Sequence, residues 1–344
     1  MPEFFPAIGQ LLTGSSMQSA ALWTLNTVPG FPPIIQTVHI LGIAVVMATL
    51  MLMNLRILGL AFPAQPLKNL TSRVLPWFWI ALASNVISGA FFVLARPNRY
   101  FNNPVFAAKL TFLFAAVLLA IGFQLLMKRY PHYWEQTRKI WLDRTVALLS
   151  LALLLMVIMA GRWIAYLEYL QYPLWSMEAY DAGPQANLWL RIENWPLSQV
   201  IAATNWFPLI ESIHVIAITL VVGSILWVDL RLLGLAATRL PVSTLSQQLL
   251  PWTWGAFAVS TVSGLAMFIT RASAHVDNPA FRWKILLLVL AGANMAYFHF
   301  RVYKSVHEWD ENIAPPRQLK IIGATSLLLW SGVMLSGRWI GHIV

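Results

Sequence analysis

The sequence has no cysteine and very few charged residues. Asp, Glu, Lys and Arg make up only 10% of the 344 residues, whereas an ordinary soluble domain contains about 25%. Because cysteine is absent, disulfides, thiolate metal sites and thiol catalysis are excluded. The low charge, together with 58% hydrophobic residues and a mean hydropathy of +0.66, excludes a soluble globular fold. The chain is expected to be an integral membrane protein.

Motifs of nucleotide chemistry and of hydrolases are also missing. There is no P-loop, no glycine-rich dinucleotide fingerprint after a strand, and no Ser-His-Asp or metalloprotease spacing. The net charge of +10 is the feature that would suggest a nucleic-acid partner. In a membrane protein it indicates cytoplasmic loops rich in Lys and Arg instead. We therefore expect no nucleic acid, and the lipid bilayer as the principal partner.

Eight apolar runs are long enough to cross a membrane. Each is about 20 residues long and lacks a period of two, so each is expected to be a helix. The predicted fold class is all-α, a polytopic membrane protein with eight transmembrane helices. The runs cover residues 34–55, 76–95, 107–127, 145–166, 209–230, 250–270, 283–301 and 320–341.

The distribution of charge predicts the orientation in the membrane. Most Lys and Arg residues lie in the loops after the first, third, fifth and seventh runs. The connector 167–208 contains only Arg191 as a basic residue, against four acidic ones, Glu168, Glu178, Asp181 and Glu193. The positive-inside rule places the basic loops in the cytoplasm and this connector outside. The prediction is a bacterial inner (cytoplasmic) membrane protein with both termini in the periplasm.

Residues 1–33 are too polar, and too often interrupted by Pro and Gly, to form a span. They also lack the basic start and small-residue cleavage site of a signal peptide. We expect them to form an interfacial segment on the outer face, where Phe4, Phe5 and Trp23 can act as anchors.

The second half of the sequence repeats the first at an offset of 175 residues. "NLRILGLA" (54–61) corresponds to "DLRLLGLA" (229–236), and "NPVFAAK" (103–109) to "NPAFRWK" (278–284). "GRWI" occurs at both 161–164 and 337–340. The predicted units are residues 34–166 and 209–344. Four spans per unit is an even number, so the two repeats should be parallel and related by a pseudo-two-fold axis along the membrane normal.

These motifs also resemble a known family. The stretch "NWFPLIESIHVIAITLVVGSILWVDLRLLGLA" (205–236) is similar to an uncharacterised family of bacterial four-helix membrane proteins with a P-x-x-E-x-x-H start and a D-L-R-L-L-G end. It is more distantly similar to copper-resistance-D and b-type cytochrome membrane domains. The resemblance covers nearly the whole chain as two copies. The first copy departs from it, with Gln36 at the glutamate position and Asn54 at the aspartate position.

Repeat-related polar residues are predicted to share one membrane depth. His39 and His214 each lie 17 residues before the arginine at the cytoplasmic end of their run, a rise of about 25 Å. Arg162 and Arg338 reach a similar height on the fourth and eighth runs, and His342 lies one turn beyond Arg338. These residues are the candidate site.

The remaining histidines are placed elsewhere. His299 lies 15 residues inward of Lys284, about 22 Å deeper, so it cannot share one metal with His214. Its counterpart in the first half is Gln124. His132, His275 and His307 fall in loops and are expected to be solvated.

The first functional hypothesis is a b-type haem protein that transfers electrons near the periplasmic face. His39 and His214 would be axial ligands of one haem b between the repeats, with His342 as a further ligand candidate. Arg162 and Arg338 would pair with the propionates. Trp163 and Trp339 adjoin these arginines and are counted with the cofactor site. Gln36 and Glu211, three residues before each histidine, are candidate acceptors for the imidazole N–H. A periplasmic redox partner or other membrane subunits would accompany this role.

Two alternatives stay open. The protein can be a transporter or a copper-handling protein, because tandem repeats are common in transporters and copper(I) favours Met and His. However, Met47, Met51 and Met53 lie well below His39 and have no methionine equivalents in the second copy. The protein can also be a non-catalytic membrane subunit, with arginines that only snorkel to the interface beside an aromatic belt. Whether it is an enzyme is left undecided.

Overall fold

The computed structural model describes residues 4–130, 140–166, 187–238, 240–310 and 315–343, and these residues form helices without any strand. Among them are eight helices long and apolar enough to cross a membrane, which confirms the predicted all-α membrane fold. The eight are α3 (Phe31–Leu58), α4 (Leu67–Ala95), α6 (Pro104–Arg129), α7 (Ile140–Trp163), α10 (Trp206–Leu233), α11 (Val242–Ile269), α13 (Pro279–Tyr297) and α15 (Arg317–Trp339). The span that begins with α13 continues through a π-helical turn, η4 (Phe298–Val302), then η5 (Tyr303–Ser305) and α14 (Val306–Trp309).

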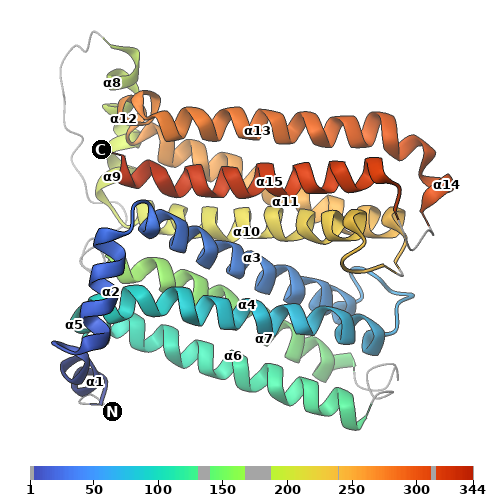
Figure 1. Ribbon diagram of the computed structural model, residues 1–344, viewed down its shortest axis with the longest axis horizontal. Coiled ribbons are helices and arrows are strands. Elements are labelled where there is room, and N and C mark those ends of the chain that lie inside the picture. Colours follow the sequence, from blue (N-terminus) through green and yellow to red (C-terminus); the bar gives the residue numbers. More distant parts are fainter. Residues whose placement is uncertain (1–3, 131–139, 167–186, 239, 311–314, 344) are drawn as a thin grey trace.

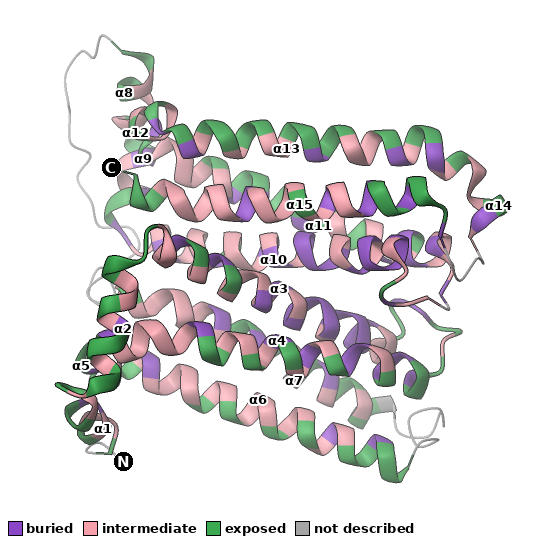
Figure 2. Ribbon diagram, in the orientation of Figure 1, coloured by how far each residue is buried: buried purple, intermediate pink, exposed green. Residues whose placement is uncertain are grey.

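Four of the eight helices form a central group, and the other four pack on the outside of it. Helices α3, α7, α10 and α15 pack against one another in the middle, where α3 contacts α10 and α15, and α10 contacts α7. Helices α4 and α6 pack on the first-repeat members of this group, and α11 and α13 on the second-repeat members. Figure 2 shows the result, with buried residues concentrated on α3 and α10 and exposed residues along α6 and α13.

Most of the short helices lie at one end of the bundle, beside both chain termini, whereas α14 lies at the other (Figure 1). They are α1 (Phe4–Leu12), α2 (Ser16–Thr27), α5 (Pro97–Phe101), α8 (Leu188–Glu193), α9 (Pro196–Ala203), α12 (Ala272–Asp277) and the 3-10 turn η6 (Ile340–His342). We call this the connector end and the opposite one the basic-loop end. Helices α1 and α2 run across the span direction, and the side chains of Phe4 and Trp23 are exposed. The acidic residues Glu168, Glu178 and Asp181 of the predicted connector, and His132, lie outside the described residues.

The repeated L-R-x-L-G motif has a structural role at the basic-loop end. The Nε atoms of Arg56 and Arg231 donate to the carbonyl oxygens of Gln65 and Leu240, at 2.6 and 2.7 Å, nine residues further on in both cases. Gly59 and Gly234 end their helices with φ of 75°, a left-handed conformation that suits glycine. The motif therefore fixes the turn from the first to the second helix of each repeat.

The two repeats meet at a close crossing of α3 and α10. A Cβ atom at Gly223 would lie 2.6 Å from the carbonyl oxygen of Ala44 and 2.8 Å from the Cβ of Ala48. Ala48 is the repeat counterpart of Gly223, so the pseudo-two-fold axis passes near this contact. Trp77 and Trp227 also meet edge to face across the interface, with ring centroids 6.4 Å apart.

This crossing gives a stability prediction. Gly223→Ala should destabilise the folded protein by about 1–3 kcal/mol, because the added methyl group has no space between α3 and α10. Gly255→Ala is the matched control, since a Cβ added at this α11 glycine would have nothing within 4 Å of it. Thermal unfolding in detergent should show a lower midpoint for Gly223→Ala only. An equal effect of both substitutions would contradict the close crossing.

Candidate functional site

Each predicted histidine is held by a serine of its own repeat. The Nδ1 atom of His39 lies 2.8 Å from the Oγ of Ser88 on α4, and that of His214 lies 3.0 Å from the Oγ of Ser263 on α11. The two imidazoles therefore belong to two separate four-helix units. They occupy equivalent places, as expected for parallel repeats.

The serine contacts indicate which imidazole nitrogen carries the proton. Each serine hydroxyl also lies 2.7 Å from a backbone carbonyl oxygen one turn earlier, that of Ser84 or Val259. A carbonyl only accepts, so the single hydroxyl proton is donated there. The Nδ1–H of the histidine then donates to the serine oxygen, and the Nε2 atom of the neutral ring carries a lone pair.

A lysine and two glycines complete the same arrangement in both repeats. Lys109 on α6 lies on the His39 side of the first repeat, and Lys284 on α13 is its counterpart on the His214 side of the second. Gly89 follows Ser88 and faces the His39 ring, because a Cβ there would be 3.4 Å from the imidazole Cε1. A Cβ at Gly161 would be 3.5 Å from the Lys109 ammonium. All four spans of a repeat thus contribute to one cluster.

The arginines connect the two repeats. Arg162 forms an ion pair with Glu211, whose Oε2 also accepts a hydrogen bond of 2.8 Å from the hydroxyl of Tyr166. Arg338 donates to the Oε1 of Gln36, from Nε at 2.9 Å and from a second nitrogen. Each arginine thus binds the first span of the other repeat. Gln36 and Glu211 were expected to support the histidines, and this is corrected: they bind the arginines, and serines hold the imidazoles.

The Arg162–Glu211 pair should contribute measurably to stability. A double-mutant cycle with Arg162→Met and Glu211→Gln should give a coupling energy of about 1–3 kcal/mol, because a hydrogen-bonded ion pair loses one charged partner in each single variant. The cycle of Arg338→Met with Gln36→Leu is the matched comparison, and its smaller coupling should reflect the neutral acceptor. A coupling near zero for Arg162–Glu211 in thermal unfolding would contradict the observed pair.

Three other site candidates lie at the connector end without contacting the imidazoles. The Nδ1 of His342 lies 3.1 Å from the carbonyl oxygen of Arg338, and this histidine is exposed. The Trp339 ring packs at Gly30, where a Cβ would be 2.8 Å from it. The Nε1 of Trp163 is buried and has no hydrogen-bond partner among the described residues.

A single haem between His39 and His214 does not fit this arrangement. Each imidazole contacts the serine of its own repeat and not a group of the other repeat. The prediction considered only the depth of the two histidines. The direction in which a side chain points also depends on how its helix is rotated about its own axis, and equal depth does not fix that rotation. Haem b and copper themselves stay untested predictions.

A larger feature lies in the half of the second repeat nearer the basic-loop end. Helices α10, α11, α13 and α15, with the turn η4, line a partly open cavity of about 370 Å³, a volume suited to a small organic ligand. Its wall is mostly apolar and includes four aromatic side chains, Trp254, Phe257, Phe298 and Trp330. Trp254 lines the cavity and is 50% exposed at the surface of the bundle.

Two ionisable side chains line this cavity, and each has a buried atom without a partner. Asp229 on α10 is 4% exposed, and its Oδ2 atom has no hydrogen bond among the described residues. The Nε2 of His299 is buried and unpaired in the same sense, while its Nδ1–H donates to the carbonyl oxygen of Met295 at 3.0 Å. His299 lies on the π-helical turn η4, an irregularity that is frequent at functional sites.

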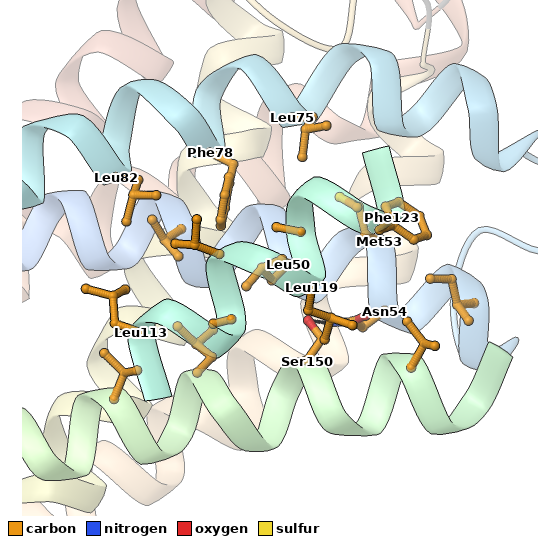
Figure 3. A pocket seen from close by; sticks show the side chains of 18 residues that line it. Leu50, Met53, Asn54, Leu75, Phe78, Leu82, Leu113, Leu119, Phe123 and Ser150 are labelled. Atoms are coloured by element: carbon orange, nitrogen blue, oxygen red, sulfur yellow. Dashed lines mark hydrogen bonds between the residues drawn. The ribbon is translucent and has the colours of Figure 1, made fainter. Parts of the chain in front are cut away.

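The equivalent region of the first repeat is closed. Its cavity is only about 60 Å³, and Figure 3 shows Leu50, Phe78, Leu82 and neighbouring side chains converging there. Asn54, the counterpart of Asp229, donates to the Oγ of Ser150 at 3.3 Å. Gln124, the counterpart of His299, accepts from the Nε1 of Trp79 at 3.1 Å. Each amide therefore has a hydrogen-bond partner within the protein.

Sequence reasoning did not identify Asp229 as a site residue and left His299 without a role. A signal for both was present in the comparison of the repeats. At three paired positions the second repeat has a titratable residue and the first has an amide: Glu211 and Gln36, Asp229 and Asn54, His299 and Gln124. Glu211 pairs with Arg162 at the connector end, whereas Asp229 and His299 line the cavity, so these two substitutions give the second repeat the ionisable cavity groups that the first repeat lacks.

The comparisons with known proteins establish the family. The family model described as "Family of unknown function (DUF6644)" matches the chain twice, at residues 27–167 and 202–343. No curated protein and no solved structure matches. The two matches cover most of the chain and coincide with the two repeats, so the chain belongs to this family as a tandem duplication.

Proposed function

We propose that the protein is a membrane transporter that exchanges a small lipophilic cation for a proton in the cavity of the second repeat. The observation that carries the proposal is that Asp229 and His299, each with an unpaired buried atom, line the same aromatic cavity. Ionisable groups inside a membrane are costly and mark ion and substrate pathways. A transporter is one of the alternatives that the repeated architecture favours.

The chemistry of the cavity supports a cationic ligand. A carboxylate supplies the counter-charge, and Trp254, Phe257, Phe298 and Trp330 supply ring faces that attract a cation. The mostly apolar wall favours a ligand whose charge is shielded by hydrocarbon. A lipophilic ligand would enter from the bilayer beside Trp254, which lines the cavity and is 50% exposed.

The exchange follows from the cost of an isolated charge in an apolar cavity. Without ligand, Asp229 holds a proton, because no cation among the described residues pairs with its carboxylate there. A bound cation stabilises the carboxylate, and the proton leaves. His299 accepts this proton at Nε2, the nitrogen that is left without hydrogen by the Nδ1–H bond to Met295. Its position near the basic-loop end then allows release on that side.

A transport assay tests this function. Proteoliposomes with the purified protein should accumulate tetraphenylphosphonium when a pH gradient is imposed, and Asp229→Asn should abolish the accumulation. His299→Gln should slow it, because the glutamine recreates the first-repeat residue and cannot carry the proton. Gln124→Ala, at the equivalent first-repeat position, is the matched control and should transport normally. Accumulation that ignores the pH gradient, or that survives in Asp229→Asn, would contradict the proposal.

The proposed orientation places the connector end in the periplasm of a bacterium with an inner membrane, and the basic loops in the cytoplasm. The supporting observation is the excess of Lys and Arg in the loops at the basic-loop end. A reporter that is active only in the periplasm should be active when fused after Val344 and silent when fused at Glu135. A cytoplasmic C-terminus would overturn the orientation while leaving the fold intact.

A further inference from the structure

Two polar side chains line the cation cavity without a part in the proposed exchange. They are Asn294 on α13 and Thr253 on α11. Their counterparts in the first repeat are Leu119 and Phe78, which line the small cavity of that repeat (Figure 3). The second repeat thus has a polar group at two wall positions where the first has hydrocarbon. A few polar groups in a mostly apolar pocket give it specificity, so both residues are candidates for ligand recognition.

Asn294 has a free hydrogen-bond acceptor. Its Nδ2 donates to the carbonyl oxygen of Ile322 on α15 at 3.3 Å. A carbonyl only accepts, so this contact fixes which branch of the amide faces α15. The Oδ1 atom is on the other branch and has no hydrogen bond among the described residues. The amide can therefore accept a hydrogen bond from a ligand in the cavity.

The hydroxyl of Thr253 offers a ligand only an acceptor. Its Oγ1 lies 2.8 Å from the Oγ of Ser224 and 3.0 Å from the carbonyl oxygen of Leu249. The Oγ of Ser224 lies 2.9 Å from the carbonyl oxygen of Val221. Of the two hydroxyl protons, one lies between the two hydroxyl oxygens and the other is donated to a carbonyl. Thr253 therefore has no proton left to donate to a ligand, but it keeps a lone pair.

Asn294 and Asp229 meet consecutive residues of α15. Asn294 binds the carbonyl oxygen of Ile322, and a Cβ added at the next residue, Gly323, would lie 3.0 Å from the carbonyl oxygen of Asp229. The amide and the carboxyl group therefore line the cavity at about the same level. With the unpaired atoms described above, the cavity wall has four acceptor atoms: Asp229 Oδ2, His299 Nε2, Asn294 Oδ1 and Thr253 Oγ1.

We propose that the transported cation is a protonated primary or secondary amine on an apolar body, and that Asn294 and Thr253 select it through its N–H groups. This inference rests on the proposed function, since Asp229 supplies the counter-charge. An ammonium group has up to three N–H donors, whereas a quaternary ammonium or a phosphonium has none. A cation without N–H groups displaces water from the acceptors and leaves them unpaired, which weakens its binding.

Two ligands that share one body test the selection. Competition against labelled tetraphenylphosphonium compares 2-phenylethylammonium with its N,N,N-trimethyl analogue. The wild type should bind the ligand with N–H groups at least about 10-fold more tightly, the effect of one hydrogen bond to a charged donor. Size does not explain such a preference, because the trimethyl compound is smaller than tetraphenylphosphonium. Equal affinities, or tighter binding of the trimethyl compound, would overturn the proposal.

Variants of the two polar residues locate the selection. Asn294→Leu recreates Leu119 of the first repeat and should remove most of the preference by weakening amine binding alone. Thr253→Val should reduce the preference in the same direction. Thr261→Val is the matched control, because this α11 hydroxyl donates to the carbonyl oxygen of Phe257 at 2.9 Å but does not line the cavity. A preference that survives intact in both cavity variants would contradict the assignment.

Tetraphenylphosphonium binding separates this inference from the proposed exchange, because that ligand needs Asp229 and no N–H acceptor. If Asn294→Leu loses it, the variant has misfolded, and Thr253→Val, which keeps the side-chain shape, decides the test. Binding of tetraphenylphosphonium that depends on Asp229, without any amine preference, would overturn the selection and leave the exchange standing. An amine preference that needs Asn294 but not Asp229 would support the selection and overturn the exchange.

Discussion

Asp229→Asn should weaken the binding of tetraphenylphosphonium by about 30-fold or more, because removing one member of a buried charge pair typically costs about 2 kcal/mol or more. The substitution preserves the shape of the side chain and recreates Asn54 of the first repeat. The loss should therefore come from the missing counter-charge and not from altered packing. Equilibrium dialysis of the purified protein with labelled ligand measures the effect.

Two controls separate charge from hydrophobicity. Tetraphenylborate has nearly the same shape as tetraphenylphosphonium but the opposite charge, so it should bind weakly to the wild type and should not be weakened further by Asp229→Asn. Asn54→Ala changes the equivalent residue in the small first-repeat cavity and should leave binding unchanged. Binding of the cation should also weaken as the pH falls, because a proton on Asp229 removes the charge that the ligand needs. Equal binding of both ions would show that the cavity recognises hydrocarbon alone.

Filling the cavity should have the second large effect. Gly292 lines the cavity, and a Cβ added there would have nothing within 4 Å of it. Gly292→Phe should abolish cation binding while the protein remains folded, since the ring has the cavity itself to occupy. Gly255→Phe provides the matched control, because this glycine also has open space around it but does not line the cavity.

The measurement is again binding of labelled tetraphenylphosphonium, with thermal unfolding as the check on folding. Wild-type affinity in a folded Gly292→Phe variant would place the ligand elsewhere in the molecule. Loss of binding in both glycine variants would indicate a general disturbance of the bundle.

The fold followed from simple physical regularities of the sequence. Apolar runs of about 20 residues fixed the number of spans, because the bilayer allows only helices or closed barrels. The offset of 175 residues fixed the parallel repeats, and the family model matches the same two segments. The rise per residue of a helix predicted that His39 and His214 lie at the same depth. The structure gives these two residues equivalent environments in the two repeats.

The site was harder to predict because depth does not determine direction. Whether His39 faces the other repeat or its own serine depends on the rotation of α3 about its axis, and an almost uniformly apolar helix gives no amphipathic signal of that rotation. The cavity was hidden for a different reason. It depends on side-chain volumes, such as that of Gly292 in the second repeat where the first has Val117. The pattern of apolar residues along a helix does not show where such small side chains leave a cavity.

The central claim is that a cation and a proton exchange at one carboxyl group. Isothermal titration of tetraphenylphosphonium into the purified protein, in two buffers of different ionisation enthalpy, counts the protons released on binding. The account predicts about one proton released per cation bound at a pH where the empty site is protonated, weakened binding without proton release in Asp229→Asn, and release that is unaffected by Asn54→Ala. Cation binding without proton release at any pH, or release that persists in Asp229→Asn, would contradict it.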